Sequence, residues 1–234
     1  MEIRDNITAL PSKIVQEFEQ LSTSVVSDAI DILELTSGGC LPYTIRPLYS
    51  YSKPLVGLVT TVYAPDGTSL PIHLAMVTHA HGRVLLIATD NYKHCAFLGD
   101  IQAHLTALNG CKGIVLDGFI RDKEGIKSLN LPIYCTGTYP KRPGKADIGG
   151  INTPITIGNV KIHSGDLIMA DSDGVIIIPQ EHAITVLETA KEKDISDSNR
   201  LKRVKEFEYS SAKDIHDFSS ILTNDVAHYI KKHM

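Results

Sequence analysis

Hydrophobic positions recur along the chain with two different periods, and these periods predict an alternation of helices and strands. Apolar residues at helical spacing predict helices over residues 11–21, 25–35 and 180–193. Runs rich in Val, Leu and Thr predict buried strands over residues 55–63 and 84–88. The same reasoning predicts further strands at 132–135, 167–170 and 175–179, a helix at 70–78, and a hairpin within 153–162. Strands joined both by hairpins and by crossovers indicate a mixed α/β arrangement.

Near the middle of the chain, a helix, a strand and a loop are expected in succession. Ile101, Leu105 and Leu108 follow the spacing of one helical face. Asp100 precedes this pattern and is a good helix cap, and Gly110 follows it as a natural helix end. We therefore expect a helix between Asp100 and Gly110.

The strand expected at 113–116 leads through the turn Asp117-Gly118 to Arg121 and Asp122. If this strand packs beside the preceding helix, the N-terminus of the helix and the end of the strand lie at the same edge. That arrangement would bring Asp100, Arg121 and Asp122 together.

This grouping predicts a particular chemistry. The backbone N–H groups of Ile101 and Gln102, in the first helical turn, can hold a carboxylate, and Arg121 can grip the same anion with two hydrogen bonds. Asp100 and Asp122 supply hard oxygen ligands that suit Mg²⁺ or Mn²⁺. Spacing alone favours the plainer interpretation, in which Asp100 only caps the helix and the Arg-Asp pair lies on a surface loop.

Composition narrows the protein class. The 234 residues fit one domain with a terminal extension, and a hydrophobic content of 43% is ample for a core. The net charge of −4 and the absence of a basic stretch argue against a general nucleic-acid binder. Neither a signal peptide nor a membrane span is expected, and the four cysteines form no CxxC motif. These features favour a cytoplasmic protein with reduced thiols and no membrane partner.

Two further features leave alternatives open. The histidines at 73, 79, 81 and 94 lack the tight spacing of a zinc site, so a carboxylate site for a hard cation is preferred. Residues 138–151 are rich in Pro and Gly and carry three basic residues, which fits a plain surface turn or a lid over a site. The plain turn is favoured because most such loops are connectors.

Three motifs in one order resemble a known family. Asp100, twenty intervening residues and Arg121-Asp122 match the D-x20-R-D signature of the RraA-like family, which includes class II 4-hydroxy-4-methyl-2-oxoglutarate aldolases. The segment STSVVSDAID at 22–31 resembles the N-terminal motif T-x-x-V-S-D-A-L of that family. The segment HSGDLIMADSDGVIIIP at 163–179 resembles its motif P-G-D-x-x-x-A-D-x-D-G-V-x-x-I-P.

The resemblance implies a fold and an assembly. It implies a compact layered α/β sandwich of the swivelling β/β/α type with a mixed sheet, within a single domain 1–234. The core would span about 20–190, and 191–234 would form a C-terminal helical extension. It also implies a homo-oligomer, a trimer or a dimer of trimers, in which a neighbouring subunit contributes a carboxylate to the metal. By position, Asp197 is the nearest counterpart of that carboxylate.

The resemblance also implies a divalent-metal-dependent lyase that cleaves 4-hydroxy-2-oxo acids to release pyruvate, with oxaloacetate decarboxylase activity through the same pyruvate enolate. Gly99, Ile101, Gln102 and Arg121 would bind the 2-oxo acid, and Asp122 would hold Mg²⁺ or Mn²⁺. Asp100 would bind the metal through a water that carries a proton, so that Arg121 and Asp100 are the catalytic residues.

A non-catalytic alternative exists within the same family. Some RraA-type members bind and inhibit an RNA-degrading endonuclease. Such regulators are typically shorter and lack a long C-terminal segment, so the apolar positions of the tail, among them Leu201 and Tyr229, favour the aldolase branch.

Overall fold

The computed structural model describes residues 1–4, 10–208 and 221–233, which divide into two compact units, Met1–Ala190 and Lys191–Met234. The strands are β1 (Glu2–Ile3), β2 (Gly39–Cys40), β3 (Arg46–Pro47), β4 (Leu55–Tyr63), β5 (Val84–Ala88), β6 (Ala96–Leu98), β7 (Gly113–Leu116), β8 (Phe119–Ile120), β9 (Ile133–Cys135), β10 (Gly137–Thr138), β11 (Gly150–Ile151), β12 (Ile155–Ile157), β13 (Val160–Ile162), β14 (Leu167–Ala170) and β15 (Val175–Ile178). The helices are α1 (Ser12–Phe18), α2 (Thr23–Ile32), α3 (Leu70–Thr78), α4 (Asp100–Leu108), α5 (Lys123–Ile126), the 3₁₀ turn η1 (Gln180–His182), α6 (Ala183–Glu208) and α7 (Asn224–His233).

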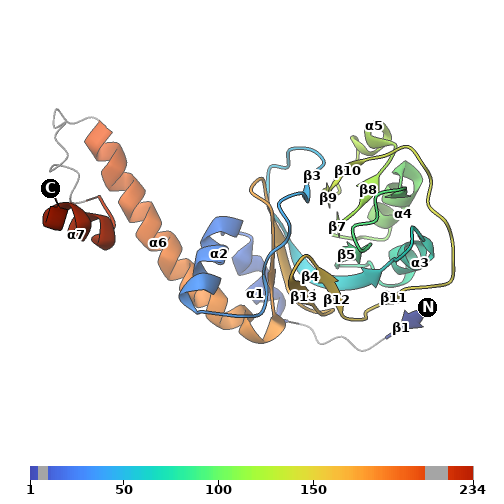
Figure 1. Ribbon diagram of the computed structural model, residues 1–234, viewed down its shortest axis with the longest axis horizontal. Coiled ribbons are helices and arrows are strands. Elements are labelled where there is room, and N and C mark those ends of the chain that lie inside the picture. Colours follow the sequence, from blue (N-terminus) through green and yellow to red (C-terminus); the bar gives the residue numbers. More distant parts are fainter. Residues whose placement is uncertain (5–9, 209–220, 234) are drawn as a thin grey trace. The chain divides into compact units, whose positions relative to one another are not determined.

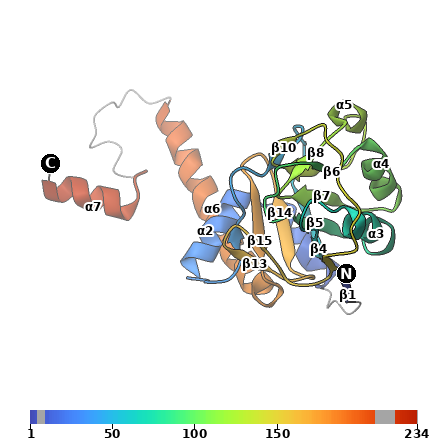
Figure 2. The same cartoon turned by 45° about the vertical axis from the view of Figure 1, so that its right-hand side comes forward.

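A mixed sheet organises the first unit (Figures 1 and 2). Among the described residues its strands follow the order β2-β15-β14-β4-β5-β7-β9-β3. In addition, β11 pairs with β4, and β1 pairs with β11. The pairs β4–β5, β5–β7 and β7–β9 are parallel, whereas β14 and β15 run antiparallel to their neighbours. The predicted α/β fold with a mixed sheet is therefore confirmed.

The long strand β4 explains how one sheet supports two helical layers. Val56 and Leu58 pack with α1, α2 and the start of α6, whereas Val62, on the same face, packs with α3 and α4. The opposite face, through Leu55 and Val59, packs against the β12–β13 hairpin. Since both faces of β4 are covered, its sequence is nearly continuously apolar, as is typical of a central strand.

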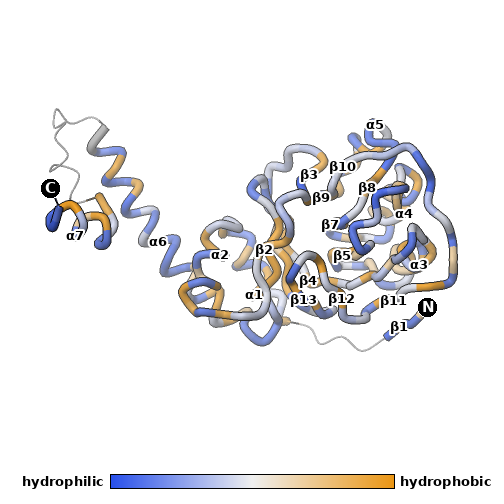
Figure 3. The backbone as a smooth tube through the Cα atoms, in the orientation of Figure 1, coloured by the Kyte–Doolittle hydropathy of each residue, from blue (hydrophilic) through white to orange (hydrophobic). Residues whose placement is uncertain are grey.

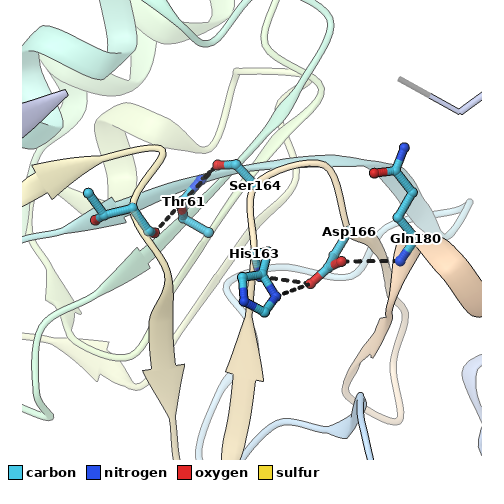
Figure 4. A network of polar contacts seen from close by, with 6 residues as sticks. Thr61, His163, Ser164, Asp166 and Gln180 are labelled. Carbon is cyan, nitrogen blue, oxygen red and sulfur yellow. Dashed lines mark hydrogen bonds and ion pairs between the residues drawn. The ribbon is translucent and has the colours of Figure 1, made fainter. Parts of the chain in front are cut away.

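Buried carboxylates fix the ends of the elements. The Asp166 carboxylate, 4% exposed, accepts hydrogen bonds from the backbone N–H groups of His163 (2.7 Å) and Gln180 (3.1 Å), as Figure 4 shows. It thereby ties the β13–β14 turn to the chain just before α6. Nearby, the Ser164 hydroxyl accepts the Thr61 N–H at 2.9 Å and so ties the same turn to β4.

The acidic turn between β14 and β15 also has a structural role. Asp171 accepts the backbone N–H of Thr23 at 2.9 Å and the hydroxyl of Thr23 at 2.7 Å, so it holds the start of α2 across 148 positions of sequence. The same carboxylate accepts the backbone N–H of Asp173 at 2.9 Å. Gly174 follows with a φ of 154°, a backbone conformation that glycine adopts more readily than other residues.

The second unit is helical. It contains the C-terminal part of α6 and the helix α7, and the Arg200 guanidinium donates to the Ile221 backbone oxygen at 2.8 Å. Hydrophobic and hydrophilic colours alternate along both helices in Figure 3. No helix in the described part of the chain is both long and apolar enough to span a membrane.

Candidate functional site

The candidate site lies where the parallel strands end. The strands β4, β5 and β7 run side by side, and the segments that leave their carboxyl ends lead to α3, to β6 and α4, and to the Arg121-Asp122 loop. The helices α3 and α4 pack against each other, side by side in both Figure 1 and Figure 2. In open α/β sheets, ligands bind at this edge.

Asp122 is held against the start of α4. Its backbone adopts the left-handed conformation with a φ of 57°, and it precedes α5. Its carboxylate lies so close to Gly99 that a Cβ atom built on Gly99 would be 2.5 Å from Asp122 Oδ2. Glycine at position 99 therefore leaves room for the carboxylate, since any larger residue would displace it.

Asp100 has the reciprocal placement. It is the first residue of α4, and a Cβ atom built on Gly125 of α5 would be 2.9 Å from Asp100 Oδ2. Asp100 therefore packs against the α5 segment and Asp122 packs against the α4 segment. The expectation that helix start and strand end meet is confirmed by these contacts.

Arg121 lies between the two segments. Its backbone N–H donates to the Leu98 oxygen at 3.0 Å, which ties the loop to β6. Its Nε atom is 3.2 Å from Asp122 Oδ2, and both side chains remain about two-fifths exposed, at 39% and 43%. The guanidinium therefore keeps donors that can bind a ligand.

A cavity of about 410 Å³ opens beside Arg121. It is lined by Ser69, His73, Phe97, Leu98, Gly99, Gln102, Arg121, Arg142, Pro143, Gly144 and Lys145. The lining holds three cationic side chains and no carboxylate. Ser69 and Gly99, the N-cap residues of α3 and α4, also face it, so the positive ends of two helix dipoles add to the charge. The cavity is suited to an anion with more than one negative group.

Residues 142–145 form a fixed wall of this cavity. The Gly144 N–H donates to the Gly67 oxygen at 2.8 Å, and the Ser69 N–H donates to the Gly144 oxygen at 3.0 Å. The two alternatives for residues 138–151, a plain turn or a lid, stay predictions, and residues 142–145 of this segment line the cavity. Sequence reasoning missed Arg142 and Lys145 as site residues, although the basic residues of this loop were the signal.

His73 was also missed as a site residue. It lies in the first turn of α3, lines the cavity and is partly buried. Burial, with a smaller contribution from the Lys145 charge, lowers the pKa of the His73 imidazole. Periodicity placed His73 on a helix, but nothing local in the sequence placed it in the same cavity lining as Arg121.

The N-terminus of α4 differs in detail from the expected cap. Gly99, and not Asp100, is the N-cap residue, and the Gln102 side chain accepts the Gly99 N–H at 3.1 Å. The Ile101 N–H donates to Asp100 Oδ1 at 2.7 Å, and the Ile101 side chain is exposed. Binding of a substrate carboxylate by the Ile101 N–H would therefore require Asp100 to release it.

The residues present fit a hard divalent cation. Asp100 begins α4 and packs beside Gly125, and Asp122 precedes α5 and packs beside Gly99, so both offer carboxylate oxygens where these two segments meet. Mg²⁺ is commonly held by one or two carboxylates with several waters. In the described part of the chain, no group of three or more His, Cys, Asp or Glu side chains gathers at one point. Water, substrate or another subunit would supply the remaining ligands of a metal bound here.

Asp197 is on the part of α6 that belongs to the second unit, where its carboxylate pairs with Lys193. His104 follows Asp100 on α4, but its ring nitrogen contacts the Asp100 backbone oxygen at 2.8 Å and not the carboxylate.

A tyrosine supports the Asp122 loop from outside the cavity. The Tyr49 hydroxyl donates to the Lys123 backbone oxygen at 2.5 Å, and the Lys123 ammonium lies 5.2 Å from the centre of the Tyr49 ring. These contacts restrain Lys123, the residue that follows Asp122.

Known proteins resemble this chain in sequence and fold. A protein of Halalkalibacterium halodurans named "Putative 4-hydroxy-4-methyl-2-oxoglutarate aldolase" is 37% identical over 191 residues, 81% of this chain and 88% of that protein. The crystal structure of an uncharacterized protein from Pseudomonas syringae pv. tomato superposes with a TM-score of 0.73 at 26% identity, over 86% of this chain and 96% of that one. The RNA-processing inhibitor RraA from Thermus thermophilis shares the fold, with a TM-score of 0.59 at 22% identity over 66% of this chain and 92% of that one. The model of the RraA-like family (Aldolase/RraA) matches residues 23–177, and the chain therefore belongs to the RraA-like family.

Proposed function

We propose that the protein is a divalent-metal-dependent lyase that cleaves 4-hydroxy-2-oxo acids, of the 4-hydroxy-4-methyl-2-oxoglutarate type, to release pyruvate. The relative from Halalkalibacterium halodurans carries the name of such an aldolase. The observation that carries the proposal is the cationic cavity beside the two segments that carry Asp100 and Asp122. A dicarboxylic substrate supplies the anionic groups for this cavity, and its 2-oxo group supplies a metal ligand.

Arg121 and the loop residues Arg142 and Lys145 bind different carboxylates of the substrate. Arg121 holds the carboxylate next to the 2-oxo group by two parallel hydrogen bonds, because the guanidinium matches a carboxylate in shape. Arg142 and Lys145 attract the second carboxylate. The dipoles of α3 and α4 lower the energy of both anions.

Cleavage of the C3–C4 bond leaves an electron pair that must be stabilised as the enolate of pyruvate. Asp122 and Asp100 would hold the cation, which stabilises the enolate oxygen when bound. Arg121 lies next to the position where this charge develops and stabilises it further. Loss of CO₂ from oxaloacetate yields the same enolate, so we propose oxaloacetate decarboxylation as a second activity.

A metal-dependence experiment tests this proposal. Pyruvate release from 4-hydroxy-4-methyl-2-oxoglutarate and from oxaloacetate is measured with Mg²⁺, with Mn²⁺ and with EDTA. We expect turnover of both substrates with either metal and none with EDTA. Turnover of neither substrate with any divalent metal would overturn the proposal and favour a regulator of the kind named for the Thermus protein.

We also propose that the protein acts as a homo-oligomer, a trimer or hexamer. Ile101, Leu105 and Leu108 form an apolar stripe on α4 that is 66%, 49% and 84% exposed, and it begins at the site. A neighbouring copy would cover this stripe, with Asp197 or a nearby carboxylate from a neighbour completing the metal's ligands.

Light scattering tests the assembly. We expect a trimer or hexamer at assay concentration and dissociation in Leu108→Lys, because a charge on the stripe opposes its burial. A fully active monomer of the parent protein would contradict a shared site.

A further inference from the structure

The two proposed activities treat the second carboxylate of the substrate differently. Cleavage of 4-hydroxy-4-methyl-2-oxoglutarate leaves this carboxylate intact, because it becomes the carboxylate of a second pyruvate. Decarboxylation of oxaloacetate removes it: the C3–C4 bond breaks, its electron pair passes to the pyruvate enolate, and the carboxylate leaves as neutral CO₂. A cation bound to the second carboxylate therefore keeps its partner throughout cleavage but loses it during decarboxylation. Such a cation influences which of the two reactions the site favours.

Arg142, in the segment between β10 and β11, has the properties of such a cation. It lines the cavity, and its guanidinium forms no hydrogen bond or ion pair with any residue that the structure describes. A guanidinium binds a carboxylate through two parallel hydrogen bonds, whereas the ammonium of Lys145 is a point charge. The charge of Lys145 also acts on the His73 imidazole, whose pKa it helps to lower. Arg142 is therefore the better suited of the two loop cations to hold a carboxylate.

The backbone is restrained on both sides of Arg142. On the N-terminal side, the Lys141 oxygen accepts the Ala96 N–H at 2.8 Å. On the C-terminal side, the Gly144 N–H donates to the Gly67 oxygen at 2.8 Å. The Arg142 side chain thus extends from a backbone that is tied to two other segments of the first unit.

The strand β6 sets the spacing between the two arginines of the cavity. The Arg121 N–H donates to the oxygen of Leu98 at one end of β6, and Ala96, at the other end, donates to the oxygen of Lys141. Two residues of a strand span roughly 7 Å, and this length separates the backbone anchors of the two arginine segments. The spacing suits a five-carbon diacid that has one carboxylate on Arg121 and the other on Arg142.

We infer that Arg142 is a specificity-determining residue that favours carbon–carbon cleavage over decarboxylation by holding the second carboxylate of the substrate. This inference rests on the proposed function and extends it to the choice between its two reactions. In cleavage, the ion pair persists in the transition state, so it improves binding without opposing the chemical step. In decarboxylation, the ion pair is stronger in the bound substrate than in the transition state, so it slows the chemical step.

Removal of the Arg142 charge should therefore affect the two reactions in opposite directions. Arg142→Gln should lower kcat/KM for 4-hydroxy-4-methyl-2-oxoglutarate about ten- to a hundredfold, mainly through KM, because a charge-assisted contact is lost. At saturating oxaloacetate, kcat for decarboxylation should rise. Arg142→Lys should be intermediate, since it keeps the charge but loses the planar fork. Parallel losses in both reactions, or a decarboxylation kcat that does not rise, would overturn the inference.

A substrate without the second carboxylate separates this role from a structural one. 4-Hydroxy-2-oxopentanoate keeps the 2-oxo acid end and lacks the second carboxylate. The preference of the parent for 4-hydroxy-4-methyl-2-oxoglutarate over this compound, as a ratio of kcat/KM, should fall at least about tenfold in Arg142→Gln. Equal losses for both compounds, together with weaker oxalate binding by calorimetry, would assign Arg142 to holding the cavity together and would overturn the inference.

A neighbouring lysine provides the matched control. Lys141 is the adjacent basic residue of the same segment, but it lies outside the cavity lining, so Lys141→Gln should keep the parent's substrate preference. The same loss of preference in Lys141→Gln as in Arg142→Gln would reveal a general effect of loop charge and would overturn the inference. A parent protein that cleaves no 4-hydroxy-2-oxo acid would refute the proposed function itself. An active parent whose preference is unchanged in Arg142→Gln would refute this inference alone.

Discussion

Two aspartates of the first unit, Asp171 and Asp122, both lie in turns that match family motifs, yet their surroundings differ. The Asp171 carboxylate accepts three hydrogen bonds from groups of the same chain: the Thr23 N–H, the Thr23 hydroxyl and the Asp173 N–H. Among the described residues, Asp122 forms one ion pair, with Arg121, and its side chain is 43% exposed. The left-handed backbone and the adjacent Gly99 hold Asp122 in place while leaving its oxygens accessible.

The difference separates carboxylates that build the fold from those that can bind a ligand. Asp166 and Asp117 belong with Asp171, since each is buried and accepts backbone N–H groups. Asp122 and Asp100 instead lie beside Gly99 and Gly125, respectively, near the protein surface, where Asp122 pairs with Arg121 at 3.2 Å and the Asp100 carboxylate accepts only the Ile101 N–H among the described residues, at 2.7 Å. A motif identifies both kinds, and the hydrogen-bond partners tell them apart.

The largest effect is expected at Asp122. Asp122→Asn removes the negative charge of the most direct metal ligand at nearly constant shape, so metal-dependent turnover should fall by about a hundredfold or more, equivalent to roughly 2.7 kcal/mol in activation free energy. Circular dichroism should show an unchanged fold, because the carboxylate supports no buried backbone group. Normal activity and metal affinity in this variant would refute the assignment of Asp122 as a ligand.

Arg121 should show the next largest effect. Arg121→Lys keeps the charge but loses the planar two-pronged contact, which costs roughly 1.5–3 kcal/mol, or about ten- to a hundredfold in kcat/KM for oxaloacetate. Metal binding should persist, since Asp100 and Asp122 remain. Oxalate, a flat mimic of the pyruvate enolate, should bind Arg121→Ala poorly. If Arg121→Ala decarboxylates and binds oxalate as the parent does, Arg121 is a surface residue.

Asp171 should show the opposite behaviour. Asp171→Asn leaves a donor facing the Thr23 N–H, and the broken contacts should cost about 1–3 kcal/mol in the free energy of unfolding. Urea denaturation measures this loss, with Asp173→Asn as the control in the same turn. Turnover per folded molecule should match the parent. A stable Asp171→Asn with impaired metal binding would reverse the comparison.

The smallest effect concerns pH. Burial raises the pKa of the Asp166 carboxyl, although the N–H groups of His163 and Gln180 act in the opposite direction. A carboxyl whose pKa is higher in the folded protein than in the unfolded chain contributes stability that is complete below the unfolded pKa and is lost as pH rises through the folded pKa. The parent should therefore gain stability relative to Asp166→Asn as pH falls from 7 toward 4, in urea titrations. A stability difference that stays constant over this range would exclude the raised pKa.

The sequence correctly predicted those helices and strands that are determined by local patterns of residues. The strands Leu55–Tyr63 and Val84–Ala88 and the helix Leu70–Thr78 agree with their predicted ranges, because continuous apolar burial and helical spacing are properties of neighbouring residues. The helix predicted at 180–193 extends to Glu208 in the structure. Its continuation lies in the C-terminal helical extension predicted for 191–234, although one unbroken helix across residue 193 was not predicted.

Distant contacts account for what the sequence did not reveal. The cavity wall depends on the pairing of Gly67 with Gly144, and the start of α2 depends on Asp171. Neither partner is marked by a local pattern. The apolar stripe that identified α4 is also not the face that α4 buries, since Ala103 and Thr106 are the buried residues of that helix. A small residue carries little hydrophobic signal even where it packs closely.

Manganese binding tests the central claim most directly, namely that the junction of Asp100 and Asp122 binds a divalent cation next to an anionic 2-oxo acid. Binding of Mn²⁺ is measured by electron paramagnetic resonance for the parent, Asp122→Asn and Asp171→Asn, with and without oxalate. The account predicts that the parent and Asp171→Asn bind Mn²⁺, more tightly with oxalate, and that Asp122→Asn does not. Equal Mn²⁺ affinity in Asp122→Asn and the parent would contradict it.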